Sequence, residues 1–130
     1  MSTWLMDNYT NPEYKKTLIG DNVFSKRYSA KSCNDDITLF FDIKNDVIND
    51  VGFDGEGCAL SIACANSFCR LIKQQNVAEA KMLANKFLLA IENKKLTENL
   101  DNELANFEKN IITGKRKICL SIVPNIINTI

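Results

Sequence analysis

Two neighbouring segments in the first half of the chain carry the apolar pattern of strands. Residues 37–43 place apolar side chains at every second position, and in residues 47–54, after the polar turn 44–46, Val47, Val51 and Phe53 share one face. Both segments are predicted to be strands, with a weaker third candidate at 24–30, because side chains of a strand point alternately to the two faces of a sheet. The following segment, 58–72, spaces its apolar residues as a helix does. This order predicts an α+β fold, with helices packed on a three-stranded antiparallel sheet.

Four further segments carry helical signals. Residues 3–9 are predicted to form a short helix that stops at Asn11–Pro12, because proline cannot continue a helix. Residues 76–91 begin with a capping box and continue as an amphipathic stripe. A shorter helix is expected around residues 100–107, and the last helical pattern covers 119–130.

Pro124 leaves two alternatives for the C-terminal helix. If Ser121 is the N-cap, Pro124 falls in the first turn, where its missing N–H costs no hydrogen bond, and Cys119 lies just outside the helix. If the helix starts earlier, we expect a kink at Pro124. In both alternatives the apolar stripe packs on the core and brings Cys119 towards it.

Composition restricts the class of protein. The chain has 130 residues, 45% of them hydrophobic, which is enough for a single domain over residues 1–130. Sixteen basic residues balance 16 acidic ones, so no overall field attracts nucleic acid. The N-terminus has neither a basic region nor a long apolar stretch, and no segment is apolar for long enough to span a bilayer. We therefore expect a cytoplasmic protein with neither a nucleic-acid nor a membrane partner.

Histidine is absent from the chain, and this absence excludes several kinds of site. A Ser-His or Cys-His pair, a histidine metal ligand and an imidazole proton shuttle all require that side chain. Any acid, base or ligand chemistry must therefore use carboxylates, amines or thiols.

Five cysteines are an odd number, and a reducing compartment makes a disulfide framework improbable. No CxxC pair occurs, which excludes zinc ribbons and thioredoxin-type motifs. Cys64 and Cys69 lie on the apolar faces of the helix predicted over 58–72, so we expect them to be buried packing residues.

The other three cysteines lie at the ends of predicted elements. Cys33 is in a polar turn, where Asn34 is suited to the left-handed conformation that would aim Cys33 and Asp35 the same way. Cys58 lies between the last strand and the next helix, where the positive helix end favours a thiolate. Cys119 follows three cations. Because the chain runs up one strand and down the next, Cys33 and Cys58 are expected at one end of the sheet. The spacing alone leaves metal binding, nucleophilic chemistry and a structural role open.

Four segments, in order, resemble one family: the SufU/IscU proteins of iron–sulfur cluster assembly, equivalent to the N-terminal domain of NifU. Residues 6–12 are similar to the opening helix and its Asn-Pro stop, and Cys33–Asp35 to a Cys-Gly-Asp turn with asparagine in place of glycine. Residues 53–61 match a Gly-x-Gly-Cys-x-x-Ser segment. Arg116–Cys119 matches the SufU pattern of an arginine three residues before the last cysteine.

Three features make the resemblance one to the SufU branch. Ile118 stands where IscU proteins carry histidine, and the IscU segment Leu-Pro-Pro-Val-Lys is missing. The 61 positions from Cys58 to Cys119 accommodate the insertion typical of SufU. Ser32 and Val123 depart from the family pattern, at the usual proline before the first cysteine and at an aromatic position, and neither departure removes a ligand.

The resemblance implies a zinc ion bound by Cys33, Asp35, Cys58 and Cys119. Arg116 is expected to offset the negative charge of these ligands from outside the coordination shell. The resemblance further implies a zinc-dependent sulfurtransferase, in which Cys33 accepts persulfide sulfur from a cysteine desulfurase and the protein passes it to a downstream iron–sulfur scaffold or to apo-proteins. Two alternatives are a scaffold that holds iron or a [2Fe–2S] cluster on the same ligands, and a zinc-stabilised module that only docks on the desulfurase.

Overall fold

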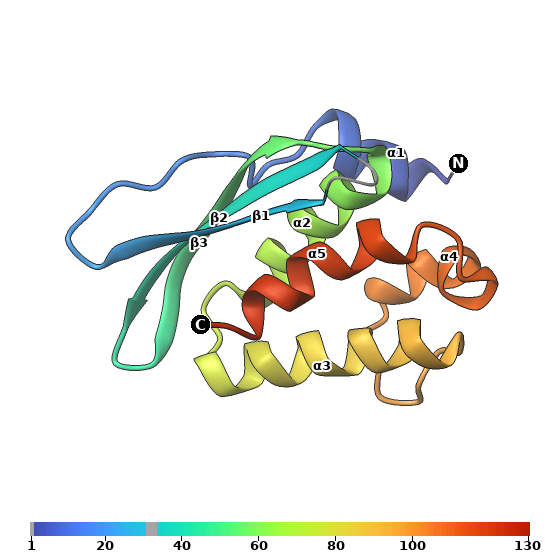
Figure 1. Ribbon diagram of the computed structural model, residues 1–130. Coiled ribbons are helices and arrows are strands. Elements are labelled where there is room, and N and C mark those ends of the chain that lie inside the picture. The colour runs from blue at the N-terminus through green and yellow to red at the C-terminus, as the bar shows by residue number, and fades with distance from the viewer. Residues whose placement is uncertain (1, 31–33) are drawn as a thin grey trace.

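The computed structural model describes residues 2–30 and 34–130, and it has the predicted α+β fold (Figure 1). The strands are β1 (Val23–Ala30), β2 (Asp35–Lys44) and β3 (Val47–Glu56). The helices are α1 (Thr3–Thr10), α2 (Ala59–Ile72), α3 (Val77–Asn93), the 3₁₀ helix η1 (Leu104–Phe107), α4 (Glu108–Thr113) and α5 (Lys117–Ile127). The predicted short helix around 100–107 is present only in part, because Leu100 precedes η1 and the helical segment continues into α4.

The sheet is an antiparallel meander in the order β1-β2-β3, as the alternation predicts. Leu39 pairs with Phe53 and Phe41 with Val51, and all four of these side chains are fully buried. The turn between β2 and β3 places Asn45 and Asp46 at positive φ (54° and 62°), as a tight hairpin with right-handed twist requires. The sheet therefore has one buried face, and the strand register fixes which residues lie at each end of the two hairpins.

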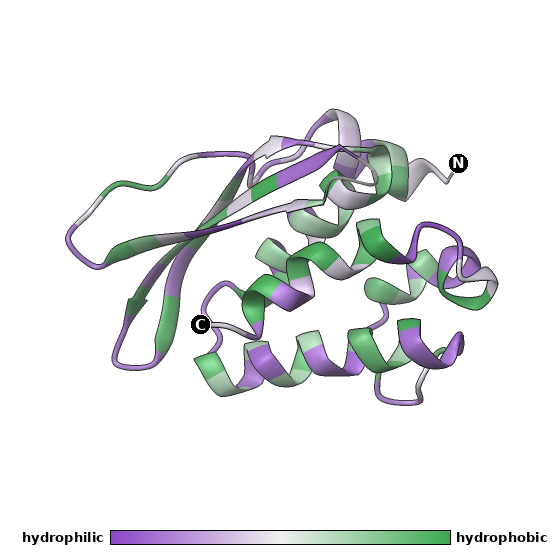
Figure 2. Cartoon of the chain, in the orientation of Figure 1, coloured by the Kyte–Doolittle hydropathy of each residue, from purple (hydrophilic) through white to green (hydrophobic). Residues whose placement is uncertain are grey.

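Helices α2 and α5 cover the buried face of the sheet, and α3 packs against them from the far side (Figure 1). Eleven α2 residues are buried, so this helix is enclosed on nearly all sides. Figure 2 shows that α5 is also largely apolar. Helix α3 begins as predicted, with the Asn76 side chain accepting a hydrogen bond from the N–H of Glu79 (2.8 Å). Within the described residues, no helix is both long and apolar enough to cross a bilayer.

Of the two alternatives for the C-terminal helix, the structure has the earlier start, so Ser121 is not the N-cap. Helix α5 starts at Lys117, after Arg116 in the left-handed conformation (φ 62°), and Pro124 lies inside the helix. Proline has no N–H for the carbonyl of Leu120, four residues earlier. The thiol of Cys64 lies 3.7 Å from that carbonyl oxygen and donates to it instead. This tertiary contact satisfies an acceptor that Pro124 leaves without its helical partner.

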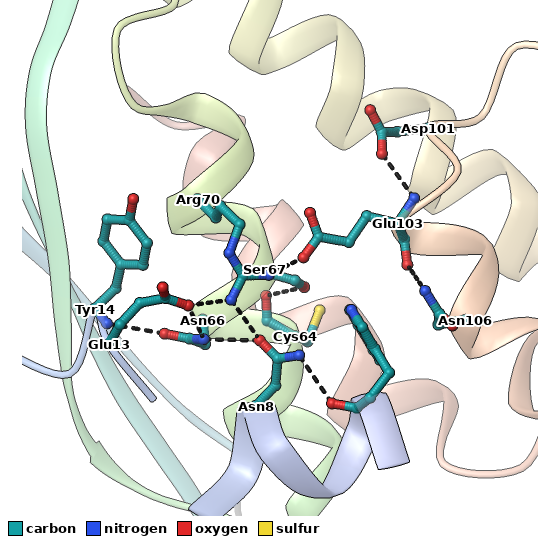
Figure 3. A network of polar contacts seen from close by, with 11 residues as sticks. Asn8, Glu13, Tyr14, Cys64, Asn66, Ser67, Arg70, Asp101, Glu103 and Asn106 are labelled. Atoms are coloured by element: carbon teal, nitrogen blue, oxygen red, sulfur yellow. Dashed lines mark hydrogen bonds and ion pairs between the residues drawn. The ribbon is translucent and has the colours of Figure 1, made fainter. Parts of the chain in front are cut away.

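A polar network joins α1 to the C-terminal half of α2 (Figure 3). The buried Asn66 side chain donates to the Asn8 side chain (2.7 Å) and accepts from the backbone N–H of Tyr14 (2.9 Å). Arg70 donates to Asn8 (2.9 Å), to Glu13 and to Glu103 just before η1. Arg70 therefore ties α1, α2 and the segment that leads into η1 to one another.

Candidate metal centre

Three predicted metal ligands converge at one end of the sheet. One potential ligand atom from each of Asp35, Cys58 and Cys119 lies within 4.8 Å of the other two. Asp35 opens β2, Cys58 is the N-cap of α2, and Cys119 is in the first turn of α5. Asp35 and Cys119 are buried, whereas Cys58 is half-buried. Side chains 84 residues apart in the sequence are thus brought to one small volume.

Strand register explains why Asp35 and Cys58 meet. Asp36 pairs with Glu56 at the end of the β2–β3 ladder, so the chain beyond Glu56 passes directly beside Asp35. There the backbone N–H of Cys58 donates to Oδ1 of Asp35 at 2.8 Å. This bond fixes the Asp35 carboxylate next to the thiol of Cys58.

Gly57 and Ser61 shape the space around this carboxylate. A Cβ at Gly57 would lie 2.6 Å from Oδ1 of Asp35 and 2.3 Å from Oγ of Ser61, distances that no real side chain tolerates. The fully buried Ser61 hydroxyl donates to the carbonyl of Cys58 at 3.0 Å. Sequence reasoning used both residues only as family markers and missed these roles. The sequence signal was the glycine directly before Cys58, because glycine permits the close approach of another group to the backbone.

The two thiols lie at the N-terminal ends of two helices. Cys58 is the N-cap of α2 in extended conformation (φ −73°, ψ 169°), and Cys119 is the third residue of α5. Helix N-termini carry partial positive charge, which stabilises negative charge nearby. The surroundings therefore suit a group of anionic ligands, as a metal ion requires.

The donor set also fits a metal chemically. Two cysteines and one aspartate are ligands that zinc accepts, and in a tetrahedral zinc site with bonds of ~2.3 Å two ligand atoms lie ~3.8 Å apart. The upper limit of 4.8 Å between the present groups is close to that separation. The arrangement can therefore hold one metal ion, and ligation by these residues remains a prediction.

Cys33 and Arg116 are the two other predicted site residues. Cys33 lies outside the described residues, but Asn34 next to it has the predicted left-handed conformation (φ 57°). Arg116, also left-handed (φ 62°), is exposed and lines the same groove as Cys58. Its expected role in offsetting ligand charge stays a prediction.

Cys64 and Cys69 are packing residues, as predicted. Their side chains are 0% and 1% exposed inside α2, and burial raises the pKa of both thiols far above its usual range. No disulfide joins Cys58, Cys64, Cys69 and Cys119 to one another. Two environments therefore exist, with Cys58 and Cys119 at helix ends and Cys64 and Cys69 in the core.

Comparison with known proteins finds one family. The family model "NifU-like N terminal domain" matches residues 2–107, a range that ends before Cys119. The zinc-dependent sulfurtransferase SufU of Bacillus subtilis (strain 168) is 28% identical over 97 residues, which cover 75% of this chain and 65% of that protein. The chain thus spans about two thirds of that relative's length. The scaffold protein IscU of Thermotoga maritima is 29% identical over 72 residues, or 55% of this chain and 51% of that protein.

Solved structures agree with the fold. A putative iron–sulfur cluster assembly scaffold protein for the SUF system from Fervidobacterium islandicum AW-1 superposes with a TM-score of 0.87 at 25% identity, covering 99% of this chain and 94% of that one. A NifU-like protein (N-terminal) from Brucella abortus gives a TM-score of 0.84 at 13% identity, covering 98% and 89%, and shows the fold alone. The strands, α2 and α5 that place Asp35, Cys58 and Cys119 thus belong to a shared architecture.

Proposed function

Since the chain belongs to the NifU-like N-terminal domain family, whose members take part in iron–sulfur cluster assembly, we propose that it is a zinc-dependent sulfurtransferase of this process. The observation that carries the proposal is the convergence of Asp35, Cys58 and Cys119. The relationship to the SufU of Bacillus subtilis supports zinc rather than another metal. We further propose that residues 1–130 act as one domain, in the cytoplasm of a bacterium.

The proposed zinc ligands are Cys33, Asp35, Cys58 and Cys119. Three thiolates and one carboxylate carry four negative charges, two more than a zinc dication neutralises. Arg116 offsets part of this excess from the groove that it shares with Cys58. When bound, zinc keeps its cysteine ligands deprotonated at neutral pH.

Cys33 is the proposed sulfur acceptor, and its partner is a cysteine desulfurase. The Cys33 thiolate attacks the outer sulfur of the partner's persulfide, the persulfide S–S bond breaks, and the partner's cysteine leaves as a thiolate. Cys58 is less suited to this role because it is held by the N–H bond to Asp35 and by α2. The sulfur then passes to a downstream scaffold or apo-protein.

A cluster scaffold is the second candidate. The relatives from Thermotoga maritima and Fervidobacterium islandicum bear that description, and cysteine ligands suit a [2Fe–2S] cluster or iron as well as zinc. Ile118 favours sulfur transfer because it replaces the histidine of the IscU pattern. A zinc-stabilised module that docks on the desulfurase without accepting sulfur is the third.

The test is a sulfur-transfer assay with a purified cysteine desulfurase and cysteine. We expect wild-type protein to raise desulfurase turnover and to gain the mass of one sulfur atom. Cys33→Ser should do neither, whereas Cys69→Ala, a core control, should do both. Undiminished stimulation by Cys33→Ser would leave only the docking role, and a brown protein with iron and sulfide would support the scaffold.

A further inference from the structure

A groove of about 480 Å³ opens beside Cys58, on the side away from the sheet. The start of α1, the start of α2 and the helical segment η1–α4 form its walls. It is lined by Ser2, Leu5, Cys58, Ala59, Leu60, Asn106, Lys109, Asn110, Lys115 and Arg116. Its volume falls within the range of small-molecule sites, which is about 300–1,000 Å³.

The charges around the groove are of one sign. Lys109, Lys115 and Arg116 contribute three cations, and no acidic side chain lines the groove among the residues that the structure describes. None of the three cations forms an ion pair within the described part of the chain. An anionic compound would therefore find the ammonium groups of Lys109 and Lys115 without an ion-pair partner among the described residues, next to Arg116, which the proposed function also assigns to the charge of the metal ligands.

The remaining lining suits an organic molecule better than a bare anion. Leu5 and Leu60 provide apolar surface. The amide nitrogens of Asn106 and Asn110 donate to the carbonyls of Glu103 and Lys115, and each side chain keeps its oxygen as an acceptor and a second N–H as a donor. A compound with an aliphatic part, amide groups and carboxylates matches all three kinds of lining group. Inorganic phosphate or a simple dicarboxylate would leave the apolar surface uncovered.

Contacts among α1, α2 and the segment at η1 hold the walls of the groove together. Trp4 of α1 packs edge-on against Phe107 of η1, with ring centroids 5.2 Å apart. Arg70 of α2 reaches Asn8 of α1 and Glu103 just before η1 (Figure 3). The same three walls are thus joined by an aromatic pair and a polar network. These contacts fix the walls relative to one another, which lowers the cost of ordering on binding.

We propose that this groove binds a small organic acid of dipeptide size, with two carboxylates, amide groups and an aliphatic side chain. The carboxylates contact the three cations, and the aliphatic part lies on Leu5 and Leu60. Since Cys58 lines the groove, the bound acid covers its thiol from the solvent side. The binding goes beyond the proposed function and does not depend on it, because no metal or sulfur chemistry is required for it.

The experiment measures binding of N-acetyl-leucyl-glutamate to the full chain by calorimetry and by amide NMR shifts. A Kd below about 1 mM is expected, in line with the efficiency of ligands of this size. The neutral isostere N-acetyl-leucyl-glutamine amide should bind at least about tenfold more weakly, and raised salt should weaken only the acid. Shifts should cluster at Leu5, Leu60 and Asn110.

Matched variants locate the site. Lys109→Gln and Lys115→Gln should each weaken binding about threefold, whereas Lys44→Gln, at the opposite hairpin end of the sheet, should leave it unchanged. Equal binding of the neutral isostere, or equal loss with Lys44→Gln, would overturn the proposal. So would binding of inorganic phosphate as tight as that of the acid. Binding of a longer acidic peptide but not of the dipeptide would assign the groove to a segment of a partner protein instead. All these outcomes are independent of desulfurase activity, which tests the proposed function.

Discussion

The two ends of helix α2 serve different purposes. At its N-terminal end, three groups that become negative on deprotonation gather within 4.8 Å: Asp35, Cys58 and Cys119. In its C-terminal half, Asn66 donates to Asn8 of α1, and Arg70 donates to Asn8 and forms an ion pair with Glu103 (Figure 3). The first arrangement is a group of side chains that could hold a metal ion, whereas the second joins polar groups of the protein to one another.

This difference separates the end of α2 that carries candidate metal ligands from the part of the helix that packs in the core. Cys64 and Cys69 are in the same helix as the neighbouring Cys58, yet they are buried and their pKa values are raised. A buried thiol with a raised pKa is a poor metal ligand and a poor nucleophile, since both roles need the thiolate. Position along the helix, and not residue type, therefore separates candidate ligands from packing residues.

The largest expected effect concerns metal affinity at the two ends. Cys58→Ser and Cys119→Ser should each weaken zinc binding about a hundredfold or more, because each removes a thiolate ligand and structural zinc sites depend on all four. Chelator competition measures the affinity. Cys69→Ala is the control in the buried half and should retain zinc. Equal zinc affinity in Cys58→Ser and Cys69→Ala would contradict the proposed difference between the two ends of α2.

Gly57→Ala should destabilise the N-terminal end of α2 without removing a ligand atom. Its Cβ would collide with Asp35 and Ser61, so we expect a loss of about 1–3 kcal/mol in the free energy of unfolding, together with weaker zinc binding. Gly20→Ala is the matched control, because its Cβ would meet only Val23 at 3.5 Å. Urea unfolding measures the free energy of unfolding of both variants. An equally small loss in both would show that the close approach of Asp35 and Ser61 to Gly57 does not matter for stability.

The contact between Cys64 and Leu120 can be measured in the buried half. Cys64→Ala should lower the free energy of unfolding by about 1–2 kcal/mol. Part of this loss arises because Pro124 denies the Leu120 carbonyl its helical partner. In a Pro124→Ala background, the restored N–H should reduce the cost of Cys64→Ala by about 0.5 kcal/mol. Purely additive unfolding energies would show that the thiol contributes packing alone.

The smallest effect is the pH dependence of the network. The hydrogen bond from Arg70 holds the pKa of Glu13 below its usual value. A carboxyl group with a lowered folded-state pKa contributes stability above its unfolded pKa of about 4.3, and this contribution is lost as pH falls through the folded value. Because Glu13 is largely exposed, the contribution is small. Urea midpoints should fall slightly less between about pH 6 and pH 3.5 in Glu13→Gln than in wild type, and an equal fall would contradict the assignment.

Local signals in the sequence predicted most of the fold. Alternation predicted two of the strands, and the chemistry of Asn34 and Asn76 predicted a left-handed turn and a helix cap, because each depends on a few neighbouring residues. The expected meander placed Cys33 and Cys58 at one end of the sheet, which is the end where the structure has Asp35 beside Cys58. These features need no knowledge of distant contacts.

Features that depend on distant contacts were not predictable from the sequence. The sequence left the start of α5 undecided, because Pro124 fits a first turn equally well until Cys64 supplies a donor for Leu120, 56 positions away. The polar network was missed because Asn66 looks like an interruption in an apolar helix until Asn8 pairs with it. The groove beside Cys58 also needs three elements in place before its walls exist.

The metal content of the protein, purified without added metal, tests the central claim most directly. Elemental analysis should find one zinc per chain in a colourless protein, and the zinc should be absent from Cys58→Ser and retained in Cys69→Ala. A protein without metal, or a brown one with iron and sulfide in place of zinc, would contradict the account.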